Sequence, residues 1–241
     1  MLFAGTAPAV AGCLPEDSEP VAIRYVHDGD TVFLDNDEKV RLIGIDTPEL
    51  GRDDRPPDPG AVEARNRLRE LVAVSDEITL RRGIDDRDKY GRLLAHVYAE
   101  GRNLQAQLLA EGLAVPLTIP PNLTHLDCYR KATAEARAAR HGLWALDRYQ
   151  PRPADTLSSH ERGYYIVTGE VQRIGRSRCC VWLNLDDDFA LRIERESLPL
   201  FEDIDFDRLE GTPLEARGYL YLRNDQLRMQ IRHPADLVIG D

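Results

Sequence analysis

The chain has 241 residues, 42% of them hydrophobic, which is enough for two domains of ordinary size. Its net charge is −11 and its pI about 5.1, so no overall positive field attracts nucleic acid, and any phosphate site must be local. Because no run of roughly 18 apolar residues occurs, we expect no membrane-spanning helix.

The N-terminal segment has the character of an export signal. Met1 to Gly12 is apolar and small, lacks Lys and Arg, and is typical of the end of a bacterial signal whose basic start is missing. Val10-Ala11-Gly12-Cys13 also fits a lipoprotein cleavage box. We interpret residues 1–20 as a signal remnant and tail, and expect a bacterial-type periplasmic or secreted protein, with Cys13 a candidate lipid attachment site. A disordered tail is the alternative.

The four cysteines suit an exported protein with a disulfide. Cys179 and Cys180 are adjacent in a strand pattern and would point to opposite faces, which leaves Cys13 and Cys128 as the pair if Cys13 is not lipidated. No Cys or His grouping has zinc spacing.

Short β-type runs come first along the chain, separated by turn signals at Asp28-Gly29 and 35–37. A loop rich in Pro and Asp follows the third strand. The elements that we predict before the linker are strands 23–26, 31–34, 40–45, 78–82 and 93–98 and helices 61–74, 101–112 and 123–142. We divide the chain into domains 21–148 and 163–241, joined by a linker at 149–162.

Two motifs carry most of the acidic and basic groups with a chemical role. Asp28-Gly29-Asp30-Thr31 forms the turn between the first strands, and Arg41 to Glu49 closes the third. In a continuous strand Asp46 shares a face with Leu42, while Arg41 lies on the other face. Two carboxylates and a main-chain carbonyl are hard oxygen ligands, which suit calcium. A third segment, Asp88-Lys89-Tyr90-Gly91-Arg92, supplies a second guanidinium at a strand start.

Together, in this order and on a β-β-β-α-β-β-α-α pattern, these segments resemble the staphylococcal nuclease family over about residues 21–144. The resemblance implies a β-rich α+β fold, an OB-type five-stranded barrel with three helices. It also implies calcium-dependent hydrolysis of DNA and RNA, preferentially single-stranded, that leaves 3′-phosphates.

The resemblance also implies roles for individual residues. Carried over by motif, Asp30 and Asp46 look like the calcium carboxylates and Thr47 like the carbonyl ligand. Arg41 and Arg92 look like the pair that clamps the scissile phosphate, and Glu49 like the group that orients or deprotonates water. Asp28 is similar to a supporting carboxylate, and Lys89 and Tyr90 to the pair that contacts a terminal phosphate.

Two stretches depart from the family. Residues 115–121, where its base-stacking aromatic residues would lie, contain no aromatic residue, and the loop after Glu49 is acidic, with Asp53, Asp54 and Asp58. A binding module that kept the nuclease barrel but lost catalysis is the competing function. Every matched position is filled here, which favours activity.

The second domain is strand-rich and similar to a second, small OB-like barrel. Two of its strands alternate arginine or tyrosine with apolar residues, a pattern that matches a single-strand stacking face. The residues of this strand-binding face are Arg217, Tyr219, Tyr221, Arg223, Arg228 and Arg232. A solvated sheet face or a domain-docking surface is the alternative.

Overall fold

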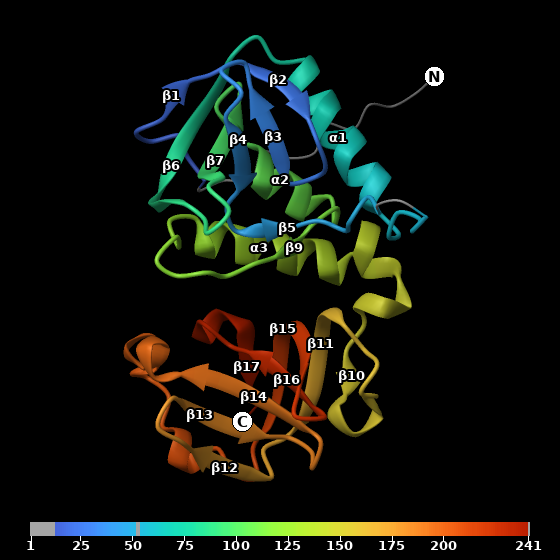
Figure 1. The fold of residues 1–241 in the computed structure, drawn as a ribbon, viewed down its shortest axis with the longest axis vertical. Helices are drawn as coiled ribbons and strands as arrows, with labels where there is room; N and C mark the ends of the chain where they lie inside the picture. The colour runs from blue at the N-terminus through green and yellow to red at the C-terminus, as the bar shows by residue number, and fades with distance from the viewer. Residues whose placement is uncertain (1–12, 52–53, 241) are drawn as a thin grey trace. The chain divides into compact units, whose positions relative to one another are not determined.

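The structure is a computed structural model that describes residues 13–51 and 54–240 (Figure 1). Most of the predicted signal remnant, residues 1–12, lies outside this range. The chain forms two compact units, one reaching Leu117 and including Pro121–Ala145, the other comprising Thr118–Pro120 and the chain from Leu146 onward. Each has a β-rich sheet and the first also carries the α-helices, so the predicted α+β class is confirmed. No described helix is long and apolar enough to cross a membrane.

The sheet of the first unit has the order β1-β6-β7-β4-β3-β2, and β8 pairs with β7. Its strands are β1 (Glu19–Pro20), β2 (Ile23–Val26), β3 (Thr31–Leu34), β4 (Lys39–Leu42), β6 (Ile78–Arg87), β7 (Leu93–Ala99) and β8 (Arg102–Asn103). Only β4 and β7 pair in parallel among these described strands. The strands at the two ends of the order, β1 and β2, are separated by just Val21 and Ala22. Val21 N donates to Ile78 O and Asp35 N to Ala22 O, which continues the pairing on both sides.

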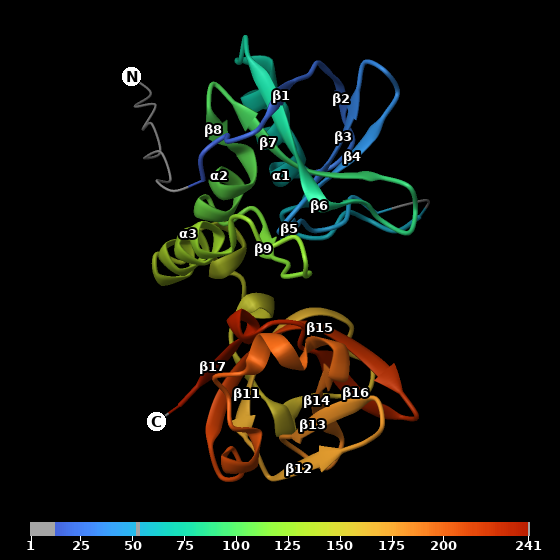
Figure 2. The same cartoon turned by 90° about the vertical axis from the view of Figure 1, so that its left-hand side faces the viewer.

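Three stretches form α-helices: α1 (Ala61–Ala73), α2 (Leu104–Ala110) and α3 (Leu126–Ala138). The helices predicted at 101–112 and 123–142 exist but are shorter. At the start of α2 the side chain of Asn103 accepts a 2.8 Å hydrogen bond from Ala106 N, which fixes the first turn there. Gly112, with φ 68°, lies beyond its end. Figure 2 shows α2 and α3 on one side of this unit's sheet.

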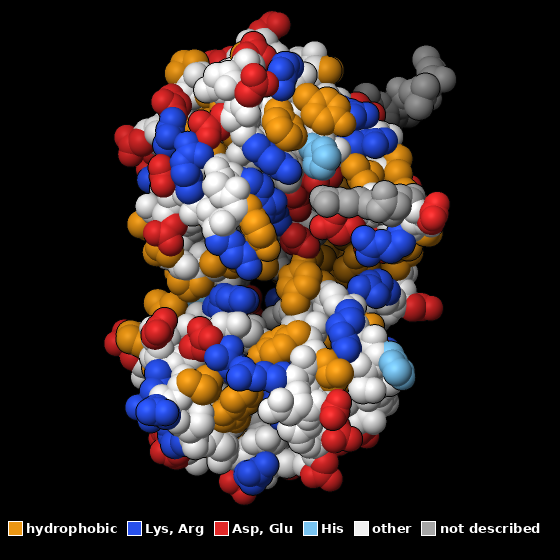
Figure 3. All heavy atoms as spheres, viewed as in Figure 1, with side chains coloured by type: hydrophobic (Ala, Val, Ile, Leu, Met, Phe, Trp, Pro, Cys, Tyr) orange, Lys and Arg blue, Asp and Glu red, His pale blue; other side chains and the backbone are white. Residues whose placement is uncertain are grey.

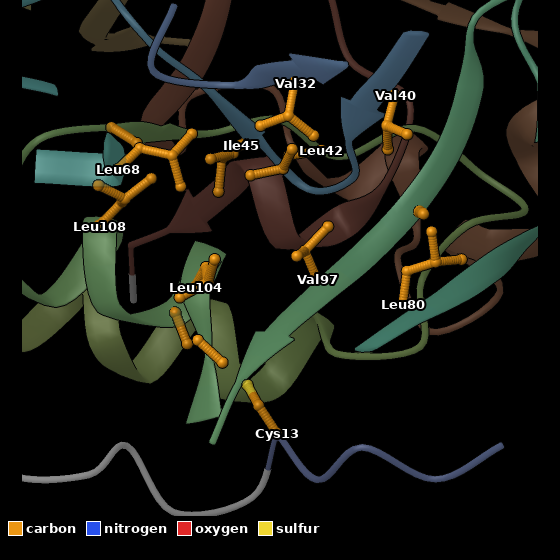
Figure 4. Packing of buried hydrophobic residues seen from close by; sticks show 14 of the residues in the cluster. Cys13, Val32, Val40, Leu42, Ile45, Leu68, Leu80, Val97, Leu104 and Leu108 are labelled. Atoms are coloured by element: carbon orange, nitrogen blue, oxygen red, sulfur yellow. The ribbon is translucent and has the colours of Figure 1, made fainter. Parts of the chain in front are cut away.

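The core of the first unit lies between this sheet and the helices (Figure 4). Val32 and Val40 from neighbouring strands, Leu68 from α1 and Leu104 and Leu108 from α2 are essentially inaccessible to solvent. Leu104 and Leu108 lie four residues apart, on one face of α2, which explains the apolar periodicity seen in the sequence.

The third predicted strand, 40–45, is interrupted. β4 ends at Leu42, and Ile45–Asp46 forms a separate strand, β5, which pairs with β9 (Val115–Pro116). Gly44 between them has φ 83°, and a Cβ there would lie 2.4 Å from the Tyr129 ring. The predicted alternation of Arg41 and Asp46 on opposite faces is therefore wrong, because the turn at Gly44 resets the side-chain direction.

The second unit repeats the strand order of the first. Its sheet runs β10-β11-β15-β16-β14-β13-β12, with β17 on β15, and its parallel pairs are β14 with β16 and β10 with β11. Its strands are β10 (Arg152–Pro153), β11 (Gly163–Glu170), β12 (Arg173–Arg176), β13 (Cys180–Asn184), β14 (Phe189–Glu194), β15 (Pro213–Arg223), β16 (Gln226–Gln230) and β17 (Leu237–Ile239). Here too β11 and β12, far apart in the order, are consecutive in the chain. Val171 N donates to Thr212 O, and Gln172 N to Asn184 O.

Turns and short 3-10 helices complete the second unit. Asn224 and Asp225 have φ of 51° and 58° and form the turn that joins β15 to β16. β10 lies within the predicted linker, and it pairs with β11, which follows the linker. The 3-10 helices of the described chain are Gly142–Ala145, Asp147–Tyr149, Ala154–Thr156, Arg195–Phe201, Phe206–Arg208 and Pro234–Asp236.

Two buried histidines form a polar network beneath α3. His96 Nδ1 lies 2.8 Å from the Tyr129 hydroxyl and His125 Nε2 lies 2.6 Å from the Tyr98 hydroxyl, while the imidazole centroids are 4.6 Å apart. Burial, the neighbouring His125 and Arg81 together lower the pKa of His96 to about 3. The ring is therefore neutral in the folded protein over the whole physiological range.

Two disulfides link the cysteines. Cys13 is joined to Cys128 of α3, with a Cα–Cα distance of 5.9 Å, as expected for this pair. Cys179 and Cys180 are joined to each other, contrary to our expectation that they point apart. The reason is that β13 begins only at Cys180, so strand alternation does not apply to Cys179.

The Cys13–Cys128 bridge should stabilise the protein far more than the vicinal bridge does. It spans 115 residues, whereas the vicinal pair closes almost no loop, and the chain-entropy account gives about 4 to 5 kcal/mol for the long bridge. In urea unfolding, Cys13→Ser/Cys128→Ser should lose most of that amount, with Cys179→Ser/Cys180→Ser as the matched control. Equal losses in both double variants would contradict this explanation.

Acid should destabilise the protein through His96. The folded pKa lies below the unfolded value near 6.5, so the unfolded state binds the extra proton, and stability present at neutral pH is lost as pH falls from 6.5 towards 3. Between pH 7 and pH 5 the loss is about 2 kcal/mol. Urea unfolding of His96→Gln should show a correspondingly flatter pH dependence than wild type, whereas the exposed-residue control His160→Gln should not. Identical slopes for wild type and His96→Gln would exclude this role.

Candidate active site

Asp30 lies at the turn between β2 and β3, in a cluster of acidic residues formed with Asp28 and Asp46. Its side chain is buried, and Thr31 donates to Oδ1 at 2.9 Å. Asp28 supports the turn, since its Oδ1 accepts a 3.1 Å hydrogen bond from Asp30 N. Asp30 O in turn accepts from Leu42 N at 2.8 Å, which ties the turn to β4. The Asp28-Gly29-Asp30-Thr31 motif thus fixes one carboxylate at the sheet edge.

Thr47 connects this carboxylate to the loop after β5. Its N–H and hydroxyl donate to Asp30 Oδ2 at 3.0 and 3.3 Å. Gly29 makes this approach sterically feasible, because a Cβ there would lie 2.7 Å from the Thr47 methyl and 2.8 Å from Cβ of Ala64 in α1. Any larger residue at position 29 would separate the turn from the loop.

Arg41 links the two carboxylates that the sequence placed in separate motifs. Its Nη2 lies 2.6 Å from Asp46 Oδ1 and 3.1 Å from Asp30 Oδ2. Its Nη1 donates to the carbonyls of Leu42 and Ile45, both at 2.9 Å. These carbonyls belong to the turn around Gly44, so the interruption of the strand is what brings Arg41 and Asp46 together.

Burial sets the electrostatics of the cluster. Desolvation raises the pKa of Asp30 and the neighbouring Asp28 carboxylate adds to this, while Arg41 and the hydrogen bonds from Thr47 and Thr31 oppose it. Asp46 is more open, with its side chain 29% exposed against 9% for Asp30. The cluster is therefore a partly buried negative site with one open side, where a cation would relieve the desolvation of Asp30.

The donor set fits calcium in kind. Two carboxylates lie on the same guanidinium nitrogen, and the Thr47 N–H holds the loop after β5 beside one of them. In residues 13–51 and 54–240 no group of three or more His, Cys, Asp or Glu side chains is arranged to hold a metal. A cation here would need carbonyl and water oxygens besides the carboxylates, and calcium accepts such mixed oxygen shells.

Arg92 lies at the start of β7, close to the face that carries Arg41. In the parallel pairing Val40 lies opposite Leu93 and Arg41 opposite Leu94, and Arg92 directly precedes this paired stretch. Its Nε is held by Asp88 Oδ2 at 2.6 Å. Arg92 is therefore paired with Asp88, the residue that begins the turn before it.

Lys89 and Tyr90 lie in the turn between β6 and β7. Both are exposed, and Lys89 Nζ and Arg92 Cζ lie 5.0 and 5.6 Å from the centroid of the Tyr90 ring. Asp88 orders this turn by accepting from Tyr90 N at 2.9 Å. The turn therefore presents a cation and a phenol to solvent beside Arg92.

Glu49 is exposed in the loop after β5. It lines a pocket of about 400 Å³ together with Gly51, Arg55, Pro56 and Asp58. The loop is closed by a 2.9 Å hydrogen bond from Asp58 N to Glu49 O. Glu49 thus lines this pocket two residues after the anchored Thr47.

The residues of the predicted strand-binding face of the second unit differ in the contacts that they make. Arg217 is paired with Glu215 at 2.9 Å, and Tyr219 packs edge-on against Tyr164. Tyr221 and Arg228 are opposite each other on β15 and β16. Arg223 is exposed at the end of β15, and Arg232 donates to Gln230.

Sequence reasoning missed two sets of aromatic residues. Arg228 lies 5.5 Å from the ring centroid of Trp182 on β13, which extends the predicted face of the second unit. In the first unit, Tyr25, His27 and Phe33 form a surface cluster beside Asp28. The available signal was alternation, since Val26 between Tyr25 and His27 is buried and therefore turns both of them outward.

Comparison with known proteins identifies relatives of the first unit. Residues 39–146 match the family profile described as Staphylococcal nuclease homologue. The chain is 33% identical over 129 residues to Thermonuclease of Staphylococcus intermedius, a match that covers 52% of this chain and 76% of that protein.

Two further relatives come from Bacillus subtilis (strain 168). The SPbeta prophage-derived endonuclease YokF is 38% identical over 127 residues, 51% of this chain and 43% of that protein. Endonuclease YncB is 36% identical over 127 residues, 51% of this chain and 60% of that protein. The match therefore spans less than two thirds of either Bacillus protein.

Proposed function

We propose that this chain, which belongs to the staphylococcal nuclease family, is a calcium-dependent phosphodiesterase that hydrolyses DNA and RNA, preferentially single-stranded, and leaves 3′-phosphates. One observation carries the proposal: Asp30 from one motif and Asp46 and Arg41 from another meet within hydrogen-bonding distance. Such a combination of hard oxygen donors and a guanidinium suits a reaction that builds negative charge on phosphorus.

Calcium held by Asp30, Asp46 and the Thr47 carbonyl would supply positive charge to the phosphate oxygens and lower the pKa of bound water. Arg41 and Arg92 would bind the phosphate as planar bidentate donors, more strongly in the transition state than in the ground state. Glu49 would orient the attacking water and take its proton. Asp28 holds the turn that carries Asp30, and Lys89 and Tyr90 would contact a terminal phosphate.

The ion pairs of the two arginines support a site in which the cation binds before the arginines bind phosphate. Arg41 and Arg92 are each held by carboxylates, at 2.6 Å from Asp46 and Asp88 respectively. A cation on Asp46 would compete for the lone pairs that Arg41 now occupies, and the guanidinium could then turn to phosphate. The competing function, a binding module without catalysis, is less favoured, because degenerate copies lose carboxylates or arginines and this chain retains both.

For the fold, we propose that each sheet closes as an OB-type barrel, the first five-stranded. The hydrogen bonds of two consecutive residues in each unit support this proposal. Val21 and Ala22 bond towards opposite ends of the first strand order, and Val171 and Gln172 do the same in the second unit. The parallel pairs β4 with β7 and β14 with β16 occupy equivalent places in the two orders. We further propose export, which the Cys13–Cys128 bridge supports.

The second unit would hold single strands through the sheet face named in the sequence, extended by Trp182. Tyr221 on β15, Arg228 on β16 and Trp182 on β13 supply two rings and a cation. Stacking on such rings is tolerant of base sequence, and arginine adds attraction to phosphate. Arg217 contributes less, since Glu215 already neutralises its charge.

Cleavage should require calcium and the open carboxylate. Release of acid-soluble nucleotides from denatured DNA should stop in excess chelator and recover with calcium, while magnesium substitutes poorly because it demands a tighter octahedral shell. Asp46→Asn should lose roughly 100-fold or more in rate, the scale of removing one preorganised electrostatic group. Asp37→Asn, an exposed carboxylate on the β3–β4 turn, is the matched control. Undiminished cleavage in chelator, or by Asp46→Asn, would disprove the metal assignment.

The face of the second unit predicts a length effect. Tyr221→Ala and Trp182→Ala should raise the KM for long single strands, by about 1 to 3 kcal/mol of binding per stacked base, and leave cleavage of dinucleotides unchanged. Val238→Ala, at an exposed apolar residue of β17, serves as control. An unchanged KM on long and short substrates in both aromatic variants would mean that this face does not bind the strand.

A further inference from the structure

An exposed aromatic cluster lies on the first unit beside the acidic turn. Tyr25 of β2 is 45% exposed. The centroids of Tyr25, His27 and Phe33 are 6.1 to 6.3 Å apart, at tilted or edge-on angles. Figure 3 shows hydrophobic, histidine and basic side chains gathered over this face of the sheet, with acidic side chains close by.

The strand register places this cluster on the same face as the candidate active site. Tyr25 lies opposite Phe33, and Phe33 lies opposite Lys39, while Thr31 lies opposite Arg41. Residues two apart on a strand share a face, so Phe33 and Lys39 continue the row that Thr31 and Arg41 begin, about 7 Å along the sheet. His27 lies next to the turn that carries Asp28 and Asp30, with its Nε2 3.9 Å from Asp28 Oδ2.

Two cations border the rings. Lys39 Nζ lies 5.5 Å from the Phe33 centroid, and Arg69 Cζ of α1 lies 5.6 Å from the Tyr25 centroid. Arg69 also donates to Val26 O at 3.3 Å, and in the described part of the chain neither cation makes a salt bridge. They therefore offer positive charge to a ligand.

Residues 115–121, where the sequence led us to look for stacking aromatic residues, contain none. We propose that Tyr25, His27 and Phe33, with Lys39 and Arg69, form the base-stacking subsite for the single strand that the active site cleaves. The inference rests on the proposed nuclease function. The rings would stack on bases adjacent to the scissile phosphate, while Lys39 and Arg69 bind the flanking phosphates. Rings that stack and cations without carboxylate partners are complementary to single-stranded nucleic acid rather than to an acidic peptide, which offers no bases.

The test is equilibrium binding without cleavage. Fluorescence anisotropy of a labelled ten-residue oligothymidylate, in excess chelator, compares the full-length protein with Tyr25→Ala and Phe33→Leu. Each variant should raise Kd about 5- to 150-fold. Tyr25→Phe, which keeps the ring, should bind as wild type does, and so should Ile84→Ala, an exposed apolar residue of β6, which β7 and β4 separate from β3. Lys39→Gln should reduce the salt dependence by about one counterion.

An abasic strand of equal length and charge separates stacking from charge. Wild type should prefer the thymidylate strand, and Tyr25→Ala should lose most of that preference. Retained preference in Tyr25→Ala, or absence of any preference in wild type, overturns the inference. A dimer in light scattering that Tyr25→Ala dissociates without changing oligonucleotide affinity would overturn it too, since the face would then bind a second copy.

The same proteins, assayed for cleavage with calcium, keep the two proposals apart. Cleavage without stacking preference would reject the subsite and leave the nuclease function standing. Stacking preference without cleavage would support the subsite and reject the nuclease function.

Discussion

The contacts of the Asp30 carboxylate hold the candidate site together. One buried side chain joins the turn after β2, the loop after β5 through Thr47, and β4 through Arg41. Burial of a carboxylate is costly unless hydrogen bonds and a cation compensate, and here the compensation comes from Arg41 and Thr47, to which the proposed function also gives roles. The position of Asp46 depends on it indirectly, because the same Arg41 guanidinium holds both carboxylates.

An acidic chain can act on a polyanion if its positive charge is concentrated locally. The net charge of −11 gives no long-range attraction, so recognition must come from short-range contacts. Arg41 and Lys39 lie on one face of β4, and the rings of Tyr25 and Phe33 continue this face on β2 and β3, while Arg92 directly precedes β7, the other partner of β4. The two units share a strand order, but their outward faces differ in which strands carry rings and arginines.

The sequence allowed prediction of much of the fold, and it indicated the residues of the candidate site, whose roles stay predictions. Strands 23–26 and 31–34 and the helix starting at Ala61 follow from periodicity and turn residues, which are local signals. The contact of Arg41 with Asp46 did not follow, because it depends on the left-handed turn at Gly44, which Tyr129 packs against from a distant helix. The Tyr25 cluster was overlooked for a similar reason: cross-strand register brings its rings together, and one strand read alone does not reveal it.

The central claim is that Asp30 and Asp46, oriented by Arg41 and Thr47, form a calcium site. Isothermal titration of calcium into the full-length protein tests it most directly. We expect one site in wild type and in Asp37→Asn, and loss of that site in Asp30→Asn, with each variant checked for folding by circular dichroism. Equal calcium binding by folded Asp30→Asn, or no calcium binding by wild type, would contradict the account.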